Sequence, residues 1–201
     1  MSIESKQEGV GLIEVMVAIL LLSVAVLGYS ALQGQAIKVT NESFERSQSL
    51  IMMRNIAEKI HSNPFVIATY ESEINDMDSI TAPTSQCGLD GVAVTKLCTA
   101  AELAIAESYK IKIDLQNYDF QIQMHPCPNT GGNGADVASN IMFSYCLISA
   151  WGNTTATIGE DDTGTDGSMD CLTARVVDDQ DVVEQAGGNY HSAATCMMME
   201  I

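Results

Sequence analysis

This chain of 201 residues has little positive charge: nine Lys and Arg residues stand against 26 Asp and Glu residues, giving a formal net charge of −17. The imbalance is strongest after residue 60, where four basic residues accompany 20 acidic ones. Because an acidic surface repels phosphate backbones, the composition argues against direct nucleic-acid binding. Solubility is the simplest explanation of the negative charge, and cation binding is the alternative.

The motifs of common enzymes and cofactor sites are also missing. No G-x-x-x-x-G-K-[ST] or G-x-G-x-x-G motif occurs, and none of the three histidines lies in a known nucleophile context. The absence of a Cys-x-x-Cys pair argues against zinc ribbons and thioredoxin-like sites. We therefore expect a protein that is not an enzyme and has no cofactor.

Proline is absent before Pro64, which leaves room for one long helix. Within Val10–Leu32, a run of 23 residues, 18 are apolar or aromatic and Glu14 is the only charged residue. A helix of this length spans roughly 35 Å, enough to cross a bilayer. After Leu32, apolar and small residues recur at steps of three and four, which is an amphipathic helical pattern. The pattern continues up to the residues before Pro64, where a helical conformation is disfavoured. We predict one helix from about Val10 to Ser62.

Glu14 and the short leader before the run need an explanation. A carboxylate inside such a run raises the free energy of membrane insertion by about 2.5–3.5 kcal/mol on insertion scales. Glu14 therefore needs a pairing partner or a functional role. The polar leader, residues 1–9, ends in Gly9, and no Ala-x-Ala site follows the apolar run, unlike in an ordinary secretory signal. Cleavage between Gly9 and Val10 would leave the helix in the mature protein.

All six cysteines lie after the apolar run. This distribution predicts disulfides in an oxidising compartment, with the N-terminus inside and the bulk of the chain outside. Six cysteines allow 15 pairings. Our working hypothesis pairs them in sequence order: Cys87–Cys98, Cys127–Cys146 and Cys171–Cys196.

The second half of the chain combines helix and strand signals. Thr99 to Lys110 is rich in helix formers, and Thr99 with Glu102 has the spacing of a capping box. Strict alternation predicts a strand, and apolar runs predict three more, over the segments Tyr118–Met124, Ile141–Trp151, Leu172–Val177 and Thr195–Ile201. Strands without intervening helices favour antiparallel pairing. The expected fold is α+β, a long helix packed on a small antiparallel sheet with disulfide-stapled loops.

Residues 159–170 form an acidic segment with a partial calcium-loop spacing. Asp162, Asp166 and Asp170 occupy its first, fifth and ninth positions, but the third and twelfth positions carry no carboxylate. We favour a solvated acidic hairpin and retain calcium binding as the alternative.

The stretch Gly9-Val10-Gly11-Leu12-Ile13-Glu14 and its helix resemble the class III signal of type IV pilins and pseudopilins. The resemblance implies that a prepilin peptidase removes the leader after Gly9 and that Val10 becomes the N-methylated N-terminus. It also places Glu14 at the family's acidic position. In a filament, the N-terminal amine of a neighbouring subunit can neutralise this carboxylate, which sets the register of the helices.

Two later segments resemble PilV-type minor pilins: Cys98-Thr-Ala-Ala-Glu-Leu-Ala104 and the strand end Ser149-Ala-Trp151. This resemblance implies a minor pilin that assists pilus assembly and initiation, and thereby adhesion and twitching motility. Its partners would be other minor and major pilins and the inner-membrane assembly platform. The alternatives are a minor pseudopilin of a type II secretion system and a membrane-anchored periplasmic binding domain.

We expect four segments in the chain. Residues 1–9 are the leader, 10–33 the transmembrane and filament-core helix, and 34–62 its amphipathic continuation. Residues 63–201 form an acidic, cysteine-containing domain in the periplasm. The protein would reside in the inner membrane as a single-pass protein and then in the pilus at the cell surface.

Overall fold

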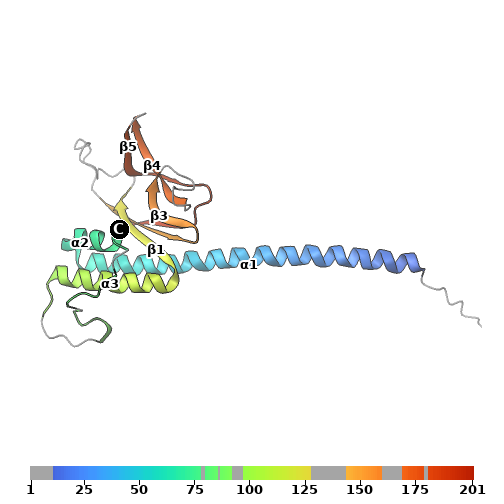
Figure 1. Cartoon of the computed structure of the whole chain (residues 1–201), viewed down its shortest axis with the longest axis horizontal. Coiled ribbons are helices and arrows are strands. Elements are labelled where there is room, and N and C mark those ends of the chain that lie inside the picture. Colours follow the sequence, from blue (N-terminus) through green and yellow to red (C-terminus); the bar gives the residue numbers. More distant parts are fainter. Residues whose placement is uncertain are drawn as a thin grey trace, which may run out of the picture. The chain divides into compact units, whose positions relative to one another are not determined.

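The computed structural model describes residues 11–77, 80–85, 87–91, 97–127, 144–159, 169–178 and 181–201. The chain divides into two compact units, Met1–Phe44 and Glu45–Ile201, and each is described by itself. The first unit contains the start of helix α1 (Leu12–Ser62), and the second contains its end together with all the other elements in Figure 1.

Helix α1 covers 51 residues, as predicted from the absence of proline. Its first turn begins where the Glu14 N–H donates to the Gly11 carbonyl at 2.9 Å. It ends immediately before Asn63 and the short helix η1 (Pro64–Val66). The predicted stop before Pro64 is therefore confirmed.

Two further helices belong to the second unit, α2 (Ile67–Asn75) and α3 (Ala100–Tyr118), with a short 3-10 turn η2 (Leu89–Gly91) between them. The capping box is confirmed, because the Glu102 N–H donates to Thr99 Oγ1 at 3.2 Å and the Thr99 N–H donates to Glu102 Oε2 at 2.8 Å. Helix α3 is longer than predicted and ends at Tyr118, and its C-cap residue Asp119 has a left-handed backbone conformation with φ 57°. Tyr118 therefore belongs to the helix and not to the strand.

The strands form two three-stranded sheets. One has the order β1-β2-β6, with both pairs antiparallel, and is made of Phe120–Pro126, Tyr145–Trp151 and Cys196–Glu200. The other has the order β3-β4-β5 and is made of Thr154–Gly159, Met169–Asp178 and Asp181–Tyr190. The α+β fold is confirmed.

The antiparallel prediction holds for the first sheet and for β4–β5, but it is wrong for β3–β4, which run parallel. Strands β3 and β5 were not predicted. Strand β3 is short and threonine-rich, and β5 contains two adjacent glycines, so neither stands out as an apolar run. The second sheet was therefore not predicted from the sequence.

The core of the second unit joins its helices to the first sheet. Met53 and Ile56 of α1 are 0% and 2% exposed and pack with Tyr70 of α2, Leu115 of α3 and Ile122 of β1. A second cluster lies between the sheets and consists of Ile148, Ala150, Ala156, Cys171, Leu172 and Cys196. Since burying one large apolar side chain contributes about 1.5–3 kcal/mol, the end of α1 is an integral part of the second unit.

Three disulfides pair the cysteines in sequence order, which is the arrangement that the working hypothesis used. Cys87–Cys98 closes the segment before α3, with a Cα–Cα distance of 5.7 Å. Cys127–Cys146 ties the end of β1 to β2, at 4.9 Å. Cys171–Cys196 joins β4 to β6, at 5.9 Å, and so links the two sheets covalently.

One side chain of α2 reaches the outer edge of β1. The Asn75 amide donates to the Met124 carbonyl at 2.9 Å, and its oxygen accepts from the Met124 N–H at 2.7 Å. Strand β1 is an edge strand of its sheet, with β2 on its other side. Asn75 therefore satisfies both backbone groups of one residue at that edge.

Candidate assembly site

The predicted processing point, Gly9 and Val10, lies outside the described residues. Cleavage between them and N-methylation of Val10 therefore stay predictions. The structure does describe Gly11 and Glu14, which form the first turn of α1. A carboxylate in this turn interacts favourably with the positive end of the helix dipole.

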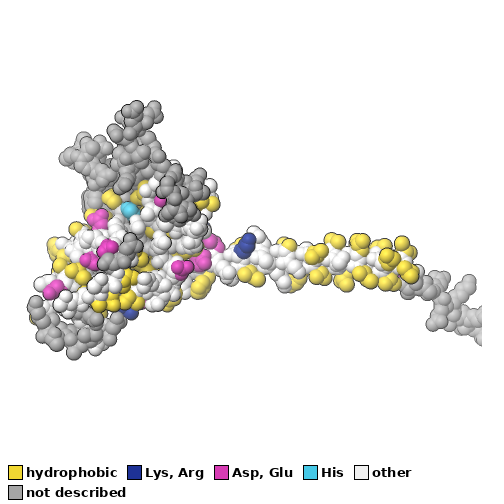
Figure 2. All heavy atoms as spheres, viewed as in Figure 1, with side chains coloured by type: hydrophobic (Ala, Val, Ile, Leu, Met, Phe, Trp, Pro, Cys, Tyr) yellow, Lys and Arg dark blue, Asp and Glu magenta, His cyan; other side chains and the backbone are white. Residues whose placement is uncertain are grey.

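The N-terminal stretch of α1 exposes its apolar side chains on every face. All the large ones from Leu12 to Val39 are between 47% and 78% exposed, and Figure 2 shows hydrophobic side chains along this part of the helix. Among the described residues, α1 is the one helix that is long and apolar enough to cross a membrane. Apolar surface of this extent indicates contact with a membrane or with partner subunits.

The hydroxyl groups in this stretch are compatible with apolar surroundings. Ser23 donates to the Leu20 carbonyl at 2.8 Å, Ser30 to the Val26 carbonyl at 2.9 Å, and Thr40 to the Ala36 carbonyl at 2.9 Å. Because each hydroxyl hydrogen is used inside the helix, burying the helix does not leave these donors without an acceptor. Glu14 differs from them, because an ionised carboxylate in apolar surroundings needs an external counter-charge.

A buried polar cluster anchors the other end of α1 inside the second unit. The Tyr70 hydroxyl of α2 donates to the Glu107 carboxylate of α3, and Lys59 Nζ of α1 lies 3.5 Å from Glu107 Oε1. Tyr70 is fully buried and Glu107 is 9% exposed. Burial, followed by the hydrogen bond and the negative charge of Glu107, raises the pKa of Tyr70 above its usual value.

This cluster predicts a loss of stability at alkaline pH. Because the pKa of Tyr70 is raised in the folded state from an ordinary value of 10.0, its contribution is fully present below about pH 10. Above that pH the unfolded chain releases the proton first, so the free energy of unfolding falls as the pH rises. Urea unfolding between pH 8 and 11 measures the effect.

The matched control for that measurement is Tyr70→Phe. We expect this variant to be less stable at pH 8, because Glu107 loses a hydrogen bond, and to lose less additional stability between pH 8 and 11. An identical pH slope for the variant and the parent protein would contradict a role for Tyr70.

This cluster was not predicted from the sequence. Tyr70 and Glu107 are 37 residues apart, and no local spacing relates them to each other or to Lys59. A single sequence contains no signal that would have brought the three together.

The calcium alternative is untested. Asp162 and Asp166 lie outside the described residues. Asp170 belongs to strand β4, and its carboxylate accepts a hydrogen bond from the Thr157 hydroxyl. Among the residues that the structure describes, no group of three or more His, Cys, Asp and Glu side chains is arranged to hold a metal ion.

Two family models match the chain. The prokaryotic N-terminal methylation motif matches residues 5–30, which include the predicted cleavage point, Glu14 and the apolar part of α1. The model described as type IV pilin Tt1218 matches residues 31–108, from the middle of α1 into α3. Nothing among the curated proteins or the solved structures matches this chain. The two models follow one another along the sequence and agree with the long helix and the α+β fold, so the chain is similar to type IV pilins over residues 5–108.

Proposed function

We propose that this chain is a minor pilin of the PilV type. It is inserted in the inner membrane, processed by a prepilin peptidase, and incorporated into a type IV pilus, where it assists assembly and initiation. Adhesion and twitching motility depend on those filaments. The finer assignment is supported by the resemblance of Cys98–Ala104 and Ser149–Trp151 to PilV-type minor pilins, in addition to the family matches.

The observation that carries the proposal is the exposed apolar stretch of α1 with its single carboxylate. Side chains such as Leu12, Leu27 and Leu32, at 70–78% exposure, cover the helix in all directions. A simple membrane anchor requires such a surface but has no use for Glu14, which raises the cost of insertion. A filament subunit uses both, because neighbouring helices cover the apolar surface and the N-terminal amine of a neighbour pairs with the carboxylate.

The disulfides support the proposed topology. All three belong to the second unit, and disulfides persist in the periplasm and outside the cell rather than in the cytosol. The second unit would therefore be periplasmic, and the leader that precedes α1 would be cytoplasmic. In this proposed topology the predicted cleavage point would lie on the cytoplasmic side of the membrane.

The first prediction of the proposal concerns the mature N-terminus. Intact-mass measurement and N-terminal sequencing should find a chain that begins at Val10 and carries one additional methyl group. Gly9→Leu should prevent the cleavage, whereas Ser5→Leu, elsewhere in the leader, should leave it unchanged. A mature protein that still begins at Met1 would favour the membrane-anchored binding domain instead.

Two experiments distinguish a pilus subunit from a pseudopilin of a type II secretion system, which shares the N-terminal features. We expect the mature chain to co-purify with pilus subunits in sheared filaments, and a deletion strain to lose pili while it continues to secrete. A strain that retained pili and lost secretion would overturn the PilV assignment in favour of the pseudopilin.

A further inference from the structure

The three disulfides of the second unit differ in their exposure to solvent. In Cys127–Cys146 and Cys171–Cys196 all four cysteines are buried, at 0–6% exposure. Cys87 and Cys98 are only partly buried, and Leu97, next to Cys98, is 87% exposed. Disulfide exchange requires an external thiolate to reach a sulfur atom. Of the three bridges, Cys87–Cys98 is therefore the one that a thiol in solution can reach most easily in the folded chain.

A hydroxyl group distinguishes the two sulfur atoms of this bridge. Ser85 Oγ lies 3.1 Å from Cys98 Sγ and 3.7 Å from Cys87 Sγ. Because a bridged cysteine has no S–H, the Ser85 hydroxyl is the donor. In an exchange the departing sulfur becomes a thiolate, and exchange is faster when that thiolate is the more stable one. A hydrogen bond to the departing sulfur stabilises its negative charge, so Ser85 favours Cys98 as the leaving sulfur and Cys87 as the sulfur that is attacked.

The backbone at Cys87 also favours opening of the bridge. Cys87 has φ 51°, a left-handed conformation that is uncommon for residues other than glycine. Such conformations persist where the surrounding structure imposes them, and here the bond to Cys98 restrains Cys87. Breaking this bond allows Cys87 to adopt a more populated backbone conformation.

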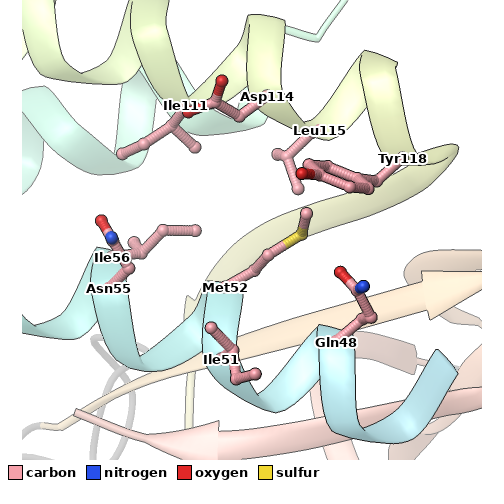
Figure 3. Close-up of a pocket in the computed structure, with 9 residues that line it drawn as sticks. All are labelled: Gln48, Ile51, Met52, Asn55, Ile56, Ile111, Asp114, Leu115 and Tyr118. Atoms are coloured by element: carbon pink, nitrogen blue, oxygen red, sulfur yellow. The ribbon is translucent and has the colours of Figure 1, made fainter. Parts of the chain in front are cut away.

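The helix that follows the bridge is held in place by other contacts. Helix α3 has its own capping box, and the Ala100 carbonyl in its first turn accepts a hydrogen bond from the Asn63 amide at 2.9 Å. The other end of α3 packs against α1 around the small hollow in Figure 3, where Ile111 and Leu115 are 5% and 1% exposed. Neither cysteine of the bridge is among the buried residues of the two core clusters. Reduction of the bridge should therefore leave α3 and the core folded.

We propose that Cys87–Cys98 is a thiol–disulfide exchange site, which a dithiol partner opens and the oxidised form of such a partner closes. A thiolate of the partner attacks Cys87 Sγ and forms a mixed disulfide there. The bond to Cys98 Sγ breaks, and Cys98 leaves with the electron pair as a thiolate and takes up a proton. The second thiolate of the partner then attacks the partner's own sulfur in the mixed disulfide and releases Cys87. The partner is oxidised to a disulfide, and the bridge is reduced by two electrons.

The exchange goes beyond the proposed function and does not depend on it. It requires a folded second unit and a dithiol in the same compartment, whether or not the chain enters a pilus. Its direct effect is confined to the segment between Cys87 and Cys98, because the other two bridges are buried.

The test is a reduction time course on the purified full chain in detergent micelles, with dithiothreitol as the dithiol. Samples are quenched with N-ethylmaleimide, and peptide mass spectrometry measures the reduced fraction of each disulfide. We expect Cys87–Cys98 to be reduced at least about tenfold faster than either other bridge, while the fluorescence of Trp151 stays native. Equal rates for the three bridges, or loss of the native fluorescence in step with the reduction of Cys87–Cys98, would overturn the proposal.

The role of Ser85 is tested on the same time course. Ser85→Ala should slow the reduction of Cys87–Cys98 at least about threefold, whereas Thr84→Ala, which removes a neighbouring exposed hydroxyl, should leave the rate unchanged. With glutathione as a monothiol and an acid quench, the mixed disulfide should be found mainly on Cys87. Adducts mainly on Cys98, or an unchanged rate in Ser85→Ala, would refute the assigned direction of attack.

Discussion

Replacing Glu14 with alanine should reduce incorporation of the mature chain into filaments by at least tenfold while it continues to enter the membrane. If Glu14 pairs with the N-terminal amine of a neighbour, the variant leaves that amine buried without its counter-charge. Breaking a buried ion pair from one side costs about 3–5 kcal/mol, and each 1.4 kcal/mol is roughly a factor of ten in an equilibrium constant. Tenfold is therefore a lower bound.

The same substitution should not harm insertion. Removing the carboxylate lowers the cost of transferring α1 into the bilayer by about 2.5–3.5 kcal/mol, so the variant should accumulate in the membrane fraction. The measurement is the ratio of the chain in sheared filaments to the chain in membranes, by quantitative immunoblot. A fall in both fractions would instead indicate misfolding.

The matched control is Glu58→Ala, which removes an exposed glutamate from the same helix within the second unit. It should incorporate normally. Glu14→Gln should behave like Glu14→Ala, because it preserves the size of the side chain and removes only the charge. Incorporation of both Glu14 variants at the level of the parent protein would rule out the pairing role.

Removing the Cys171–Cys196 disulfide should cause the largest loss of stability in the second unit. The bond joins β4 to β6 and therefore one sheet to the other, and its two cysteines are 0% and 6% exposed within the core between the sheets. A disulfide of this kind contributes about 2–4 kcal/mol. For a unit of this size the double variant Cys171→Ala with Cys196→Ala should unfold roughly 5–15 °C lower.

Trp151 provides the readout for this variant. It is the only tryptophan in the chain, it is 4% exposed, and its backbone N–H donates to the Thr195 carbonyl beside Cys196 at 3.1 Å. Its ring also packs edge-on against Phe120, with ring centroids 5.9 Å apart. Tryptophan fluorescence therefore reports the unfolding of the sheet that is no longer bonded covalently to the other sheet. The long helix does not contribute to this signal, because it contains no tryptophan.

The control is the double alanine variant of Cys87 and Cys98, whose loop spans 11 residues instead of 25. Loop length alone makes its entropic contribution about 0.7 kcal/mol smaller, and it lies outside the core between the sheets. We expect a smaller fall in the unfolding temperature. Equal losses in the two variants would show that the link between the sheets has no special importance.

The parts of the fold that could be predicted depend on local patterns. The absence of proline before Pro64 predicted the extent of α1, and the spacing of Thr99 and Glu102 predicted the start of α3, because both features act within one or two turns of helix. The alternation around Ile122 predicted β1, although its start was placed two residues early. Glu14 stood out because a charge interrupts an apolar run.

The missed features depend on contacts between distant segments. The parallel pairing of β3 with β4 is a property of topology, and neither strand encodes its partner. The same holds for the cluster of Tyr70, Glu107 and Lys59, which comes from three different helices.

The Asn75 amide also affects how copies of this chain can associate through their sheets. Unpaired strand edges invite neighbouring molecules to add strands, the first step of edge-to-edge aggregation and of amyloid. By occupying both the N–H and the carbonyl of Met124, Asn75 removes one docking register from the outer edge of β1. Asn75 therefore makes the outer edge of β1 a poorer template for strand addition by another copy of this chain.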